Sequence, residues 1–132
     1  MRRKNENLMV LDGVAVNSSL AASRNYKAVW LGHIINFSVQ AVYTGTPAGS
    51  FKLQGSNDVG NIDAQSEANQ TVNVTNWTDI ADSDVLVAAA GNFMINYQNC
   101  GFDWVRVVWT ASGAGSTPVL TKLRMVVKGT SK

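Results

Sequence analysis

The residue types that usually perform catalysis are scarce in this sequence. The chain has one histidine, His33, and one cysteine, Cys100, among 132 residues. General acid–base catalysis usually relies on histidines or paired carboxylates in a pocket, and His33, which precedes the apolar pair Ile34 and Ile35, has no evident partner. A lone cysteine makes no internal disulfide, so we expect Cys100 to be a small buried or half-buried side chain. The sequence therefore predicts a protein that is not an enzyme.

Metal binding is the next chemistry that the residue types allow. A zinc site needs several Cys and His ligands at short spacing, which one of each cannot supply. Calcium prefers carboxylate and amide oxygens, and five such side chains lie close together: Asn57, Asp58, Asn61, Asp63 and Glu67. Their spacing departs from the EF-hand loop, and clusters of Asn, Asp and Gly favour turns. We therefore expect no metal and no cofactor, with calcium as the alternative for this segment.

The sequence gives little support for a nucleotide, a nucleic acid or a membrane as a partner. No Gly-rich phosphate-binding motif stands between a strand and a helix. The net charge is only +2, and the basic stripe Lys122, Arg124 and Lys128 is small, so affinity for nucleic acid from counterion release is expected to be weak. No run of about 18 apolar residues occurs, and the N-terminal residues do not resemble a signal peptide. We expect no nucleic-acid partner, no membrane partner and no export.

Period-two alternation of apolar and polar residues recurs along the chain and predicts β-strands. In the clearest run, Phe37, Val39, Ala41 and Tyr43 share one face. Clusters of Gly, Asn, Ser and Pro separate such runs and favour turns. The predicted strands are 13–20, 27–31, 36–43, 51–54, 72–80, 85–88, 93–97, 105–110 and 119–127. These eight or nine short strands predict an all-β fold, a single-domain antiparallel β-sandwich that is jelly-roll-like.

Charge is distributed unevenly along the chain. Residues 53–105 contain seven acids and no Lys or Arg, while the rest of the chain contains eleven bases against Glu6 and Asp12. This segregation would give the molecule a basic side and an acidic side that favour docking; loops that merely carry solvated charges are the alternative. Residues 1–7 are predicted to form a flexible basic arm, or a short terminus without a role. The β-sandwich domain spans 8–132, with an acidic loop insertion around 58–71.

Four segments carry a resemblance to a known group of proteins. They are GTPAGSFKLQGSND at 45–58, NWTDI at 76–80, GNFMINYQNCGFDWVRVVWTASGAGS at 91–116, and a final strand ending in KG. In this order they resemble small virion proteins of tailed phages, over about residues 39–129. A related pattern in discoidin-like sugar-binding sandwiches supplies a rival interpretation. The chain departs from the phage pattern by inserting residues 62–76 between SND and NWTDI, which leaves the role of the insert open.

The resemblance implies a structural subunit that decorates or cements the phage head, binding where shell subunits meet; a tail or fibre component is the alternative. The implied partners are the major capsid protein and copies of the chain itself, as a homotrimer on a local threefold axis, with a glycan as the partner in the rival interpretation. The implied location is the capsid surface of the virion, after synthesis in the host cytoplasm. The candidate contact residues, chosen for their charge, are Arg2, Arg3, Lys4, Asp58, Asp63 and Glu67.

The tryptophans and their neighbours have two possible roles. Trp77 and Ile80 are expected to fill the core behind the SND turn, and either Trp104 or Trp109 to face inward, according to register. An exposed aromatic such as Trp30 or Phe102, or one of the last two tryptophans, would suit a sugar platform or a subunit contact. For each taken singly, core packing is the expected role.

Overall fold

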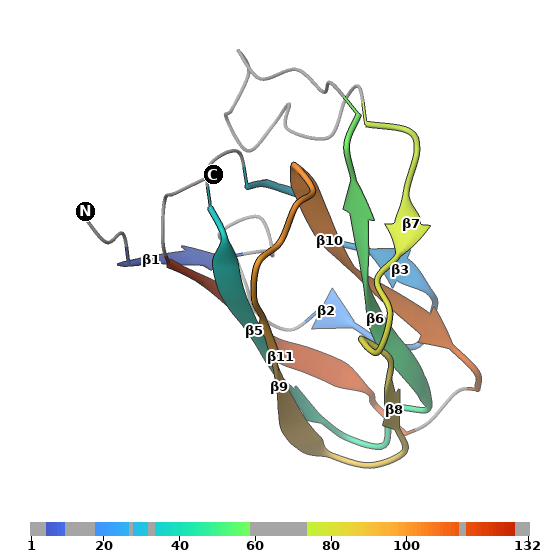
Figure 1. The fold of residues 1–132 in the computed structure, drawn as a ribbon. Coiled ribbons are helices and arrows are strands. Elements are labelled where there is room, and N and C mark those ends of the chain that lie inside the picture. The colour runs from blue at the N-terminus through green and yellow to red at the C-terminus, as the bar shows by residue number, and fades with distance from the viewer. Residues whose placement is uncertain are drawn as a thin grey trace.

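The fold is built from antiparallel strands alone over the part of the chain that is described (Figure 1). The computed structural model describes residues 5–9, 18–26, 28–31, 34–58, 74–113 and 116–128, with only the backbone for 5–9, 127 and 128. These segments contain no helix, and so none that is long and apolar enough to cross a membrane. The prediction of an all-β fold is therefore confirmed.

Two sheets make the sandwich. The five-stranded sheet has the order β1-β11-β5-β9, with β2 also beside β11, and the six-stranded sheet has the order β3-β10-β6-β7, with β4 also beside β10 and β8 beside β6. The strands are β1 Asn5–Met9, β2 Ser18–Ser19, β3 Arg24–Asn25, β4 Val29–Trp30, β5 Asn36–Thr44, β6 Gly49–Ser56, β7 Thr78–Asp79, β8 Val85–Val87, β9 Gly91–Tyr97, β10 Trp104–Ala111 and β11 Val119–Lys128. The described residues thus hold eleven strands, and the two that fall outside the predicted ranges are β1 and β3.

The core lies between the two sheets, where apolar side chains from both are removed from water. On β5 the four residues predicted to share a face, Phe37, Val39, Ala41 and Tyr43, are all buried. Trp109 on β10 is fully buried, with its ring centre 4.6 Å from that of Phe51, and its indole Nε1 donates a hydrogen bond to the carbonyl of Leu20 (3.0 Å). Cys100 is buried, as predicted, and its thiol donates a hydrogen bond to the carbonyl of Ile34 (3.2 Å).

One predicted face is wrong in its first half. In the predicted strand 119–127 the alternation sets Val119, Thr121, Leu123, Met125 and Val127 on the apolar face, opposite the basic stripe. In the structure Leu120 is fully buried, while Val119 and Thr121 are half-buried. The pairing of β11 with β5 shifts by one residue between Leu120 and Lys122. Such a bulge turns the side chains before it to the opposite face.

Strand β1 extends the five-stranded sheet at the N-terminal end of the chain. Its residues pair antiparallel with β11, from Asn5 opposite Lys128 to Met9 opposite Arg124. Three residues of the predicted arm, 5–7, are therefore part of a strand, while 1–4 lie outside the described residues. The flexibility of the arm stays a prediction.

Candidate binding groove

The two ends of the acidic insert are held together by one carboxylate. Asp58 follows β6, and it accepts hydrogen bonds from the backbone amides of Thr75 and Asn76 (2.7 Å each). It also accepts from the Asn76 side-chain amide (3.0 Å) and from the Thr75 hydroxyl (3.3 Å). These bonds, with that from the Asn76 side chain as the largest contribution, lower the pKa of Asp58 to about 2. The ionised carboxylate thus closes the base of the insert.

This arrangement gives Asp58 a structural role beside the predicted contact role, which no observation tests. The other five candidate contact residues, Arg2, Arg3, Lys4, Asp63 and Glu67, lie outside the described residues, as does His33. Within the segments that are described, no group of three or more His, Cys, Asp or Glu side chains is placed to hold a metal ion. Three of the five calcium candidates, Asn61, Asp63 and Glu67, are outside those segments, so the absence of calcium stays a prediction.

A groove of about 560 Å³ opens next to the base of the insert. It lies where the end of β6, the segment around β7, and the connection between β9 and β10 come together. One wall is polar and carries Asp58, Asn76 and Asp79, while the other is aromatic and carries Tyr97 and Phe102. The complete lining is Gly55, Ser56, Asn57, Asp58, Asn76, Thr78, Asp79, Ile80, Ala81, Tyr97 and Phe102.

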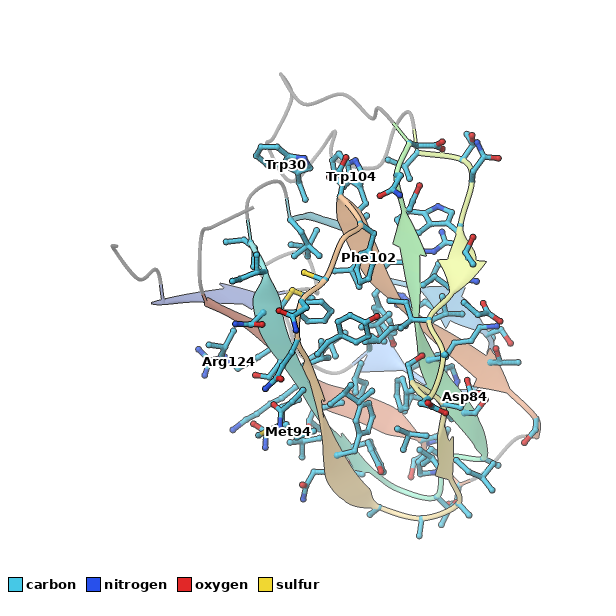
Figure 2. All side chains as sticks on the ribbon, viewed as in Figure 1. Trp30, Asp84, Met94, Phe102, Trp104 and Arg124 are labelled. Carbon is cyan, nitrogen blue, oxygen red and sulfur yellow. The ribbon has the colours of Figure 1, made fainter. Side chains whose placement is uncertain are left out.

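The aromatic wall is held by ring contacts and by a glycine. Phe102 lies 5.5 Å from Tyr97 and 6.3 Å from Phe37 between ring centres; Figure 2 shows it near the upper end of the sandwich. A Cβ on Gly55 would come within 3.1 Å of the Phe102 ring. Glycine at this position of β6 therefore allows the ring to lie directly against the strand.

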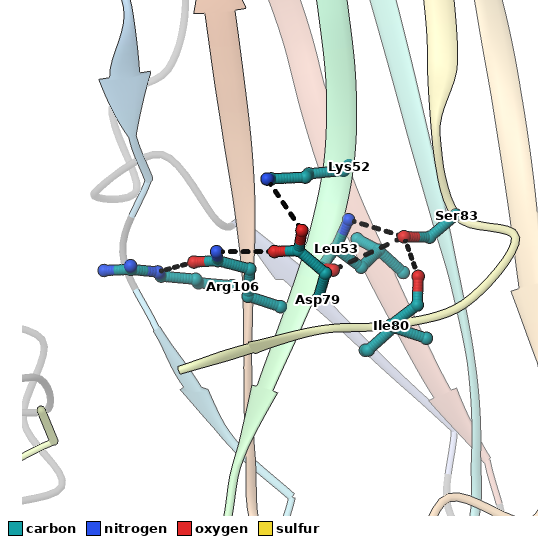
Figure 3. A network of polar contacts seen from close by, with 7 residues as sticks. Lys52, Leu53, Asp79, Ile80, Ser83 and Arg106 are labelled. Carbon is teal, nitrogen blue, oxygen red and sulfur yellow. Dashed lines mark hydrogen bonds and ion pairs between the residues drawn. The ribbon is translucent and has the colours of Figure 1, made fainter. Parts of the chain in front are cut away.

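A polar network fixes the β7 side of the groove (Figure 3). Asp79 accepts hydrogen bonds from the Gln54 amide (2.8 Å) and the Lys52 ammonium (3.0 Å). These contacts, that of Gln54 first, lower the pKa of Asp79. Arg106 donates from Nε to the Gln54 carbonyl oxygen (2.9 Å), and its guanidinium lies 4.3 Å from the centre of the Trp77 ring. Partial burial lowers the pKa of Arg106.

The turn after β7 is attached to β6 by a buried serine. The Oγ of Ser83 accepts a hydrogen bond from the Leu53 amide (3.0 Å) and donates one to the Ile80 carbonyl (2.7 Å). The Ile80 amide in turn donates to the Leu53 carbonyl (2.9 Å). Figure 3 shows the bonds of Ser83 to Leu53 and to Ile80. They fix the position of Ile80 and of the turn against β6. Because Ile80 lines the groove, they also fix that part of the groove, the groove floor.

A second, smaller apolar cluster lies on the outer face of the six-stranded sheet. Its centre is Trp104, which is fully buried beneath Ala28 and Val74, with Trp30 and Trp77 half-buried against it. The Nε1 of Trp104 has no hydrogen-bond partner among the residues that the structure describes. Trp30 and Trp104 are neighbours in the sheet, at its end near the insert (Figure 2).

This cluster corrects one prediction about the core. Trp77 was expected in the main core together with Ile80, but Trp77 packs against the outer cluster, whereas Ile80 packs against the main core. The two residues are three apart, and in an extended segment such residues point to opposite faces. Trp109 is the tryptophan that faces inward, while Trp104 points outward and is nevertheless covered.

The residues of the groove were only partly foreseeable. Phe102 was a candidate for a platform or a contact, and it does line the groove, next to Tyr97. Tyr97 is the last residue of the predicted strand 93–97, and no binding role was predicted for it. The signal that was missing is strand order, because β9 lies at the edge of its sheet and so leaves Tyr97 partly open to solvent.

Comparisons with known proteins identify a fold and no family. No protein-family model and no curated protein matches the chain. Among solved structures, the SPBc2 prophage-derived protein YomS matches with a TM-score of 0.54 and 9% identity over 98% of this chain and 96% of that one. Chitosan-binding module 1 of a chitosanase/glucanase from Paenibacillus sp. IK-5 matches with 0.52 and 17% identity, over 93% of each chain. The Tobacco streak virus coat protein matches with 0.48 and 7% identity over 96% of this chain and 85% of that one. The first two similarities show that the chain has a β-sandwich fold found both in a phage-derived protein and in a sugar-binding module.

Proposed function

We propose that the protein is a structural subunit of a tailed-phage particle that decorates or cements the head surface by binding where shell subunits meet. The order of the sequence motifs supports this role, and the fold shared with a prophage-derived protein agrees with it. In the same proposal the subunit assembles as a homotrimer and lies on the virion surface, with the major capsid protein as its partner. A place in the tail or in a fibre is the alternative within this class.

The observation that carries the proposal is a basic face on the five-stranded sheet, where the charged side chains that the structure describes, Lys122 and Arg124 on β11, are both exposed bases. The other side of the sandwich is mixed: Asp82 and Asp84 are exposed in the turn that leads to β8, and the six-stranded sheet also carries Arg24, Lys52 and Arg106. Figure 2 shows Arg124 and Asp84 on opposite sides of the molecule. A molecule with this distribution can dock on an acidic surface through its basic side.

Three bases precede the strand that borders β11. Strand β1 lies beside β11, and the basic residues Arg2, Arg3 and Lys4 come directly before β1 in the sequence. In the proposal these three charges act together with Lys122 and Arg124. In the proposal this basic side faces the shell.

Binding to particles tests the proposal directly. Shells without the protein are mixed with purified wild-type chain, and bound protein is measured by cosedimentation over a range of salt concentrations. We expect saturable binding that weakens several-fold in Arg124→Ala, and that weakens further when residues 1–4 are deleted and β1 is kept. The matched control is Thr110→Asp, which also changes the charge by one unit but lies exposed on β10 of the six-stranded sheet; it should bind like the wild type. Equal binding of all variants, or no binding to shells, would refute the proposal.

A second candidate function, carbohydrate binding, is favoured by one specific observation. The groove combines an aromatic wall, Tyr97 and Phe102, with the polar groups of Asn76 and Asp79, and sugar sites commonly combine flat aromatic surfaces with a few polar groups. A chitosan-binding module shares the fold. A glycan array with wild type and Tyr97→Ala tests this candidate: saturable binding lost in the variant, together with no affinity for shells, would make sugar binding the function.

A further inference from the structure

Strand β9 is an open edge of the five-stranded sheet. It pairs through all seven of its residues with β5 and ends the path β1-β11-β5-β9. Its other edge has no strand partner in the part of the chain that is described (Figure 1). The backbone N–H and C=O groups on that edge are therefore available to another strand.

The edge lacks the features that normally prevent strand pairing between molecules. Exposed edge strands usually contain lysines or other charged residues, prolines, or β-bulges. Residues 85–102, which include β8 and β9, contain no Asp, Glu, Lys, Arg or Pro, and the pairing of β9 with β5 is regular. The two ends of the path in the other sheet differ, because β3 carries Arg24 and β7 carries Asp79. The uncharged strands β2, β4 and β8 are only two or three residues long and offer little edge for pairing.

Apolar side chains along this edge are incompletely covered. Phe93, Ile95 and Tyr97 point toward the core but are only partly buried, because β9 has a neighbour on one side only. Met94, on the outer face, is 56% exposed (Figure 2). A strand added to β9 would cover all four and would extend the sheet without leaving a charge buried.

The sequence of β9 is suited to pairing with itself. In a two-fold antiparallel pair of identical strands, the sum of the two facing residue numbers is constant, and a pair centred on the middle residue uses the whole strand. β9 spans Gly91–Tyr97, so its middle is Met94. In this register Met94 faces its own copy, Asn92 faces Asn96, and Phe93 faces Ile95. Polar side chains meet polar ones and apolar side chains meet apolar ones on both faces.

We propose that two copies of the chain associate through their β9 strands, antiparallel and centred on Met94, to form one continuous sheet across a two-fold axis. The contact is isologous, since the same surface serves both copies. It contains no ion pair, so its strength is insensitive to salt. The two-fold pair is separate from the threefold contact of the proposed trimer. If the protein forms that trimer, the two-fold pair links one trimer to the next, and this link is the only part of the inference that rests on the proposed function.

The test uses opposite charges at the centre of the pair. The mass of the full chain in solution is measured by analytical ultracentrifugation for wild type, Met94→Lys and Met94→Asp, each alone, and for the two variants mixed. Two like charges directly opposite each other destabilise a strand pair. We expect the weight-average mass of each single variant to be half that of the wild type at the same concentration, and the equimolar mixture to recover the wild-type mass.

Three controls separate the edge contact from general effects. Leu86→Lys also replaces an exposed apolar side chain by lysine, at a position on β8 that is 85% exposed, and this variant should keep the wild-type mass. Circular dichroism melting should show both Met94 variants folded, as expected for an exposed position. The wild-type mass should also stay unchanged between low and high salt.

The outcomes are distinct from those of the particle-binding experiment, because no shell is present. Masses that are equal for wild type and Met94→Lys, a mixture that stays at the reduced mass, or an equal loss of mass in Leu86→Lys would each overturn the pairing. Loss of association at high salt would also overturn it, in favour of contacts between the basic and acidic sides. None of these results would decide whether the protein binds shells.

Discussion

Removing the hydroxyl of Ser83 tests how the floor of the groove is held. Ser83 is 2% exposed, and its Oγ is the side-chain partner of the Leu53 amide and of the Ile80 carbonyl. Alanine leaves the Leu53 N–H buried without that acceptor. A buried donor that has lost its hydrogen bond lowers the free energy of unfolding by about 1–3 kcal/mol. The cavity left by one oxygen atom is small. We therefore expect Ser83→Ala to lower the free energy of unfolding by about 2 kcal/mol.

Urea unfolding followed by tryptophan fluorescence measures this change. The midpoint should fall while the slope with denaturant stays unchanged, because the surface exposed on unfolding is the same. A loss of about 2 kcal/mol corresponds to a drop in Tm of roughly 6–10 °C for a domain of this size. Ser50→Ala, at a half-buried serine of β6, is the control and should change stability by less than about 0.5 kcal/mol. An equally small change in Ser83→Ala would show that the Leu53 amide has another partner, and the role given to Ser83 would be wrong.

Three further predictions concern the groove and the insert. The contact between Arg106 and Trp77 should give a coupling of about 1 kcal/mol in a double-mutant cycle with Arg106→Gln and Trp77→Leu, since the guanidinium is partly desolvated over the ring; a coupling near zero would refute it. The pKa of Asp58 is lowered from 3.8 to about 2, so its stabilisation is complete above pH 3.8 and is lost as the pH falls through about 2. When the free energy of unfolding is measured as a function of pH, wild type should therefore lose more of it than Asp58→Asn between pH 3.8 and 2. Parallel curves for the two proteins would contradict the role of Asp58 in holding the ends of the insert. A chelator should leave the Tm unchanged, whereas a fall of several degrees that calcium reverses would establish a metal in the insert.

Local patterns in the sequence were enough to predict the class of fold and much of the main core. Alternation over residues 36–43 placed four side chains inward, and all four are buried. Alternation failed on β11, because the bulge between Leu120 and Lys122 has no sequence signature in this chain. A period-two argument holds only while the register is continuous.

The outer cluster shows a second limit of sequence reasoning. Trp104 points away from the main core, so alternation alone would leave it exposed. It is fully buried because Val74, near the end of the insert, Trp77, just after it, and Ala28, from a distant segment, pack against it. Contacts of this kind depend on the path of the chain between sheets, which composition and periodicity do not contain. The position of β9 at an edge, which opens both the groove and the pairing surface, is of the same kind.

The hydrogen bonds that Asp58 accepts give a physical reason why this chain can carry an insert that the phage pattern it resembles lacks. Four hydrogen bonds from Thr75 and Asn76 fix the two ends of the insert against each other, and the network on Asp79 and the bonds of Ser83 hold the segment that follows. The sandwich therefore meets the same two chain ends whatever lies between them. Doubling the length of a flexible loop costs only about 0.6 kcal/mol. We therefore expect changes in the length or sequence of the insert to have little effect on the fold, whereas substitution of Asp58 or Ser83 should destabilise it.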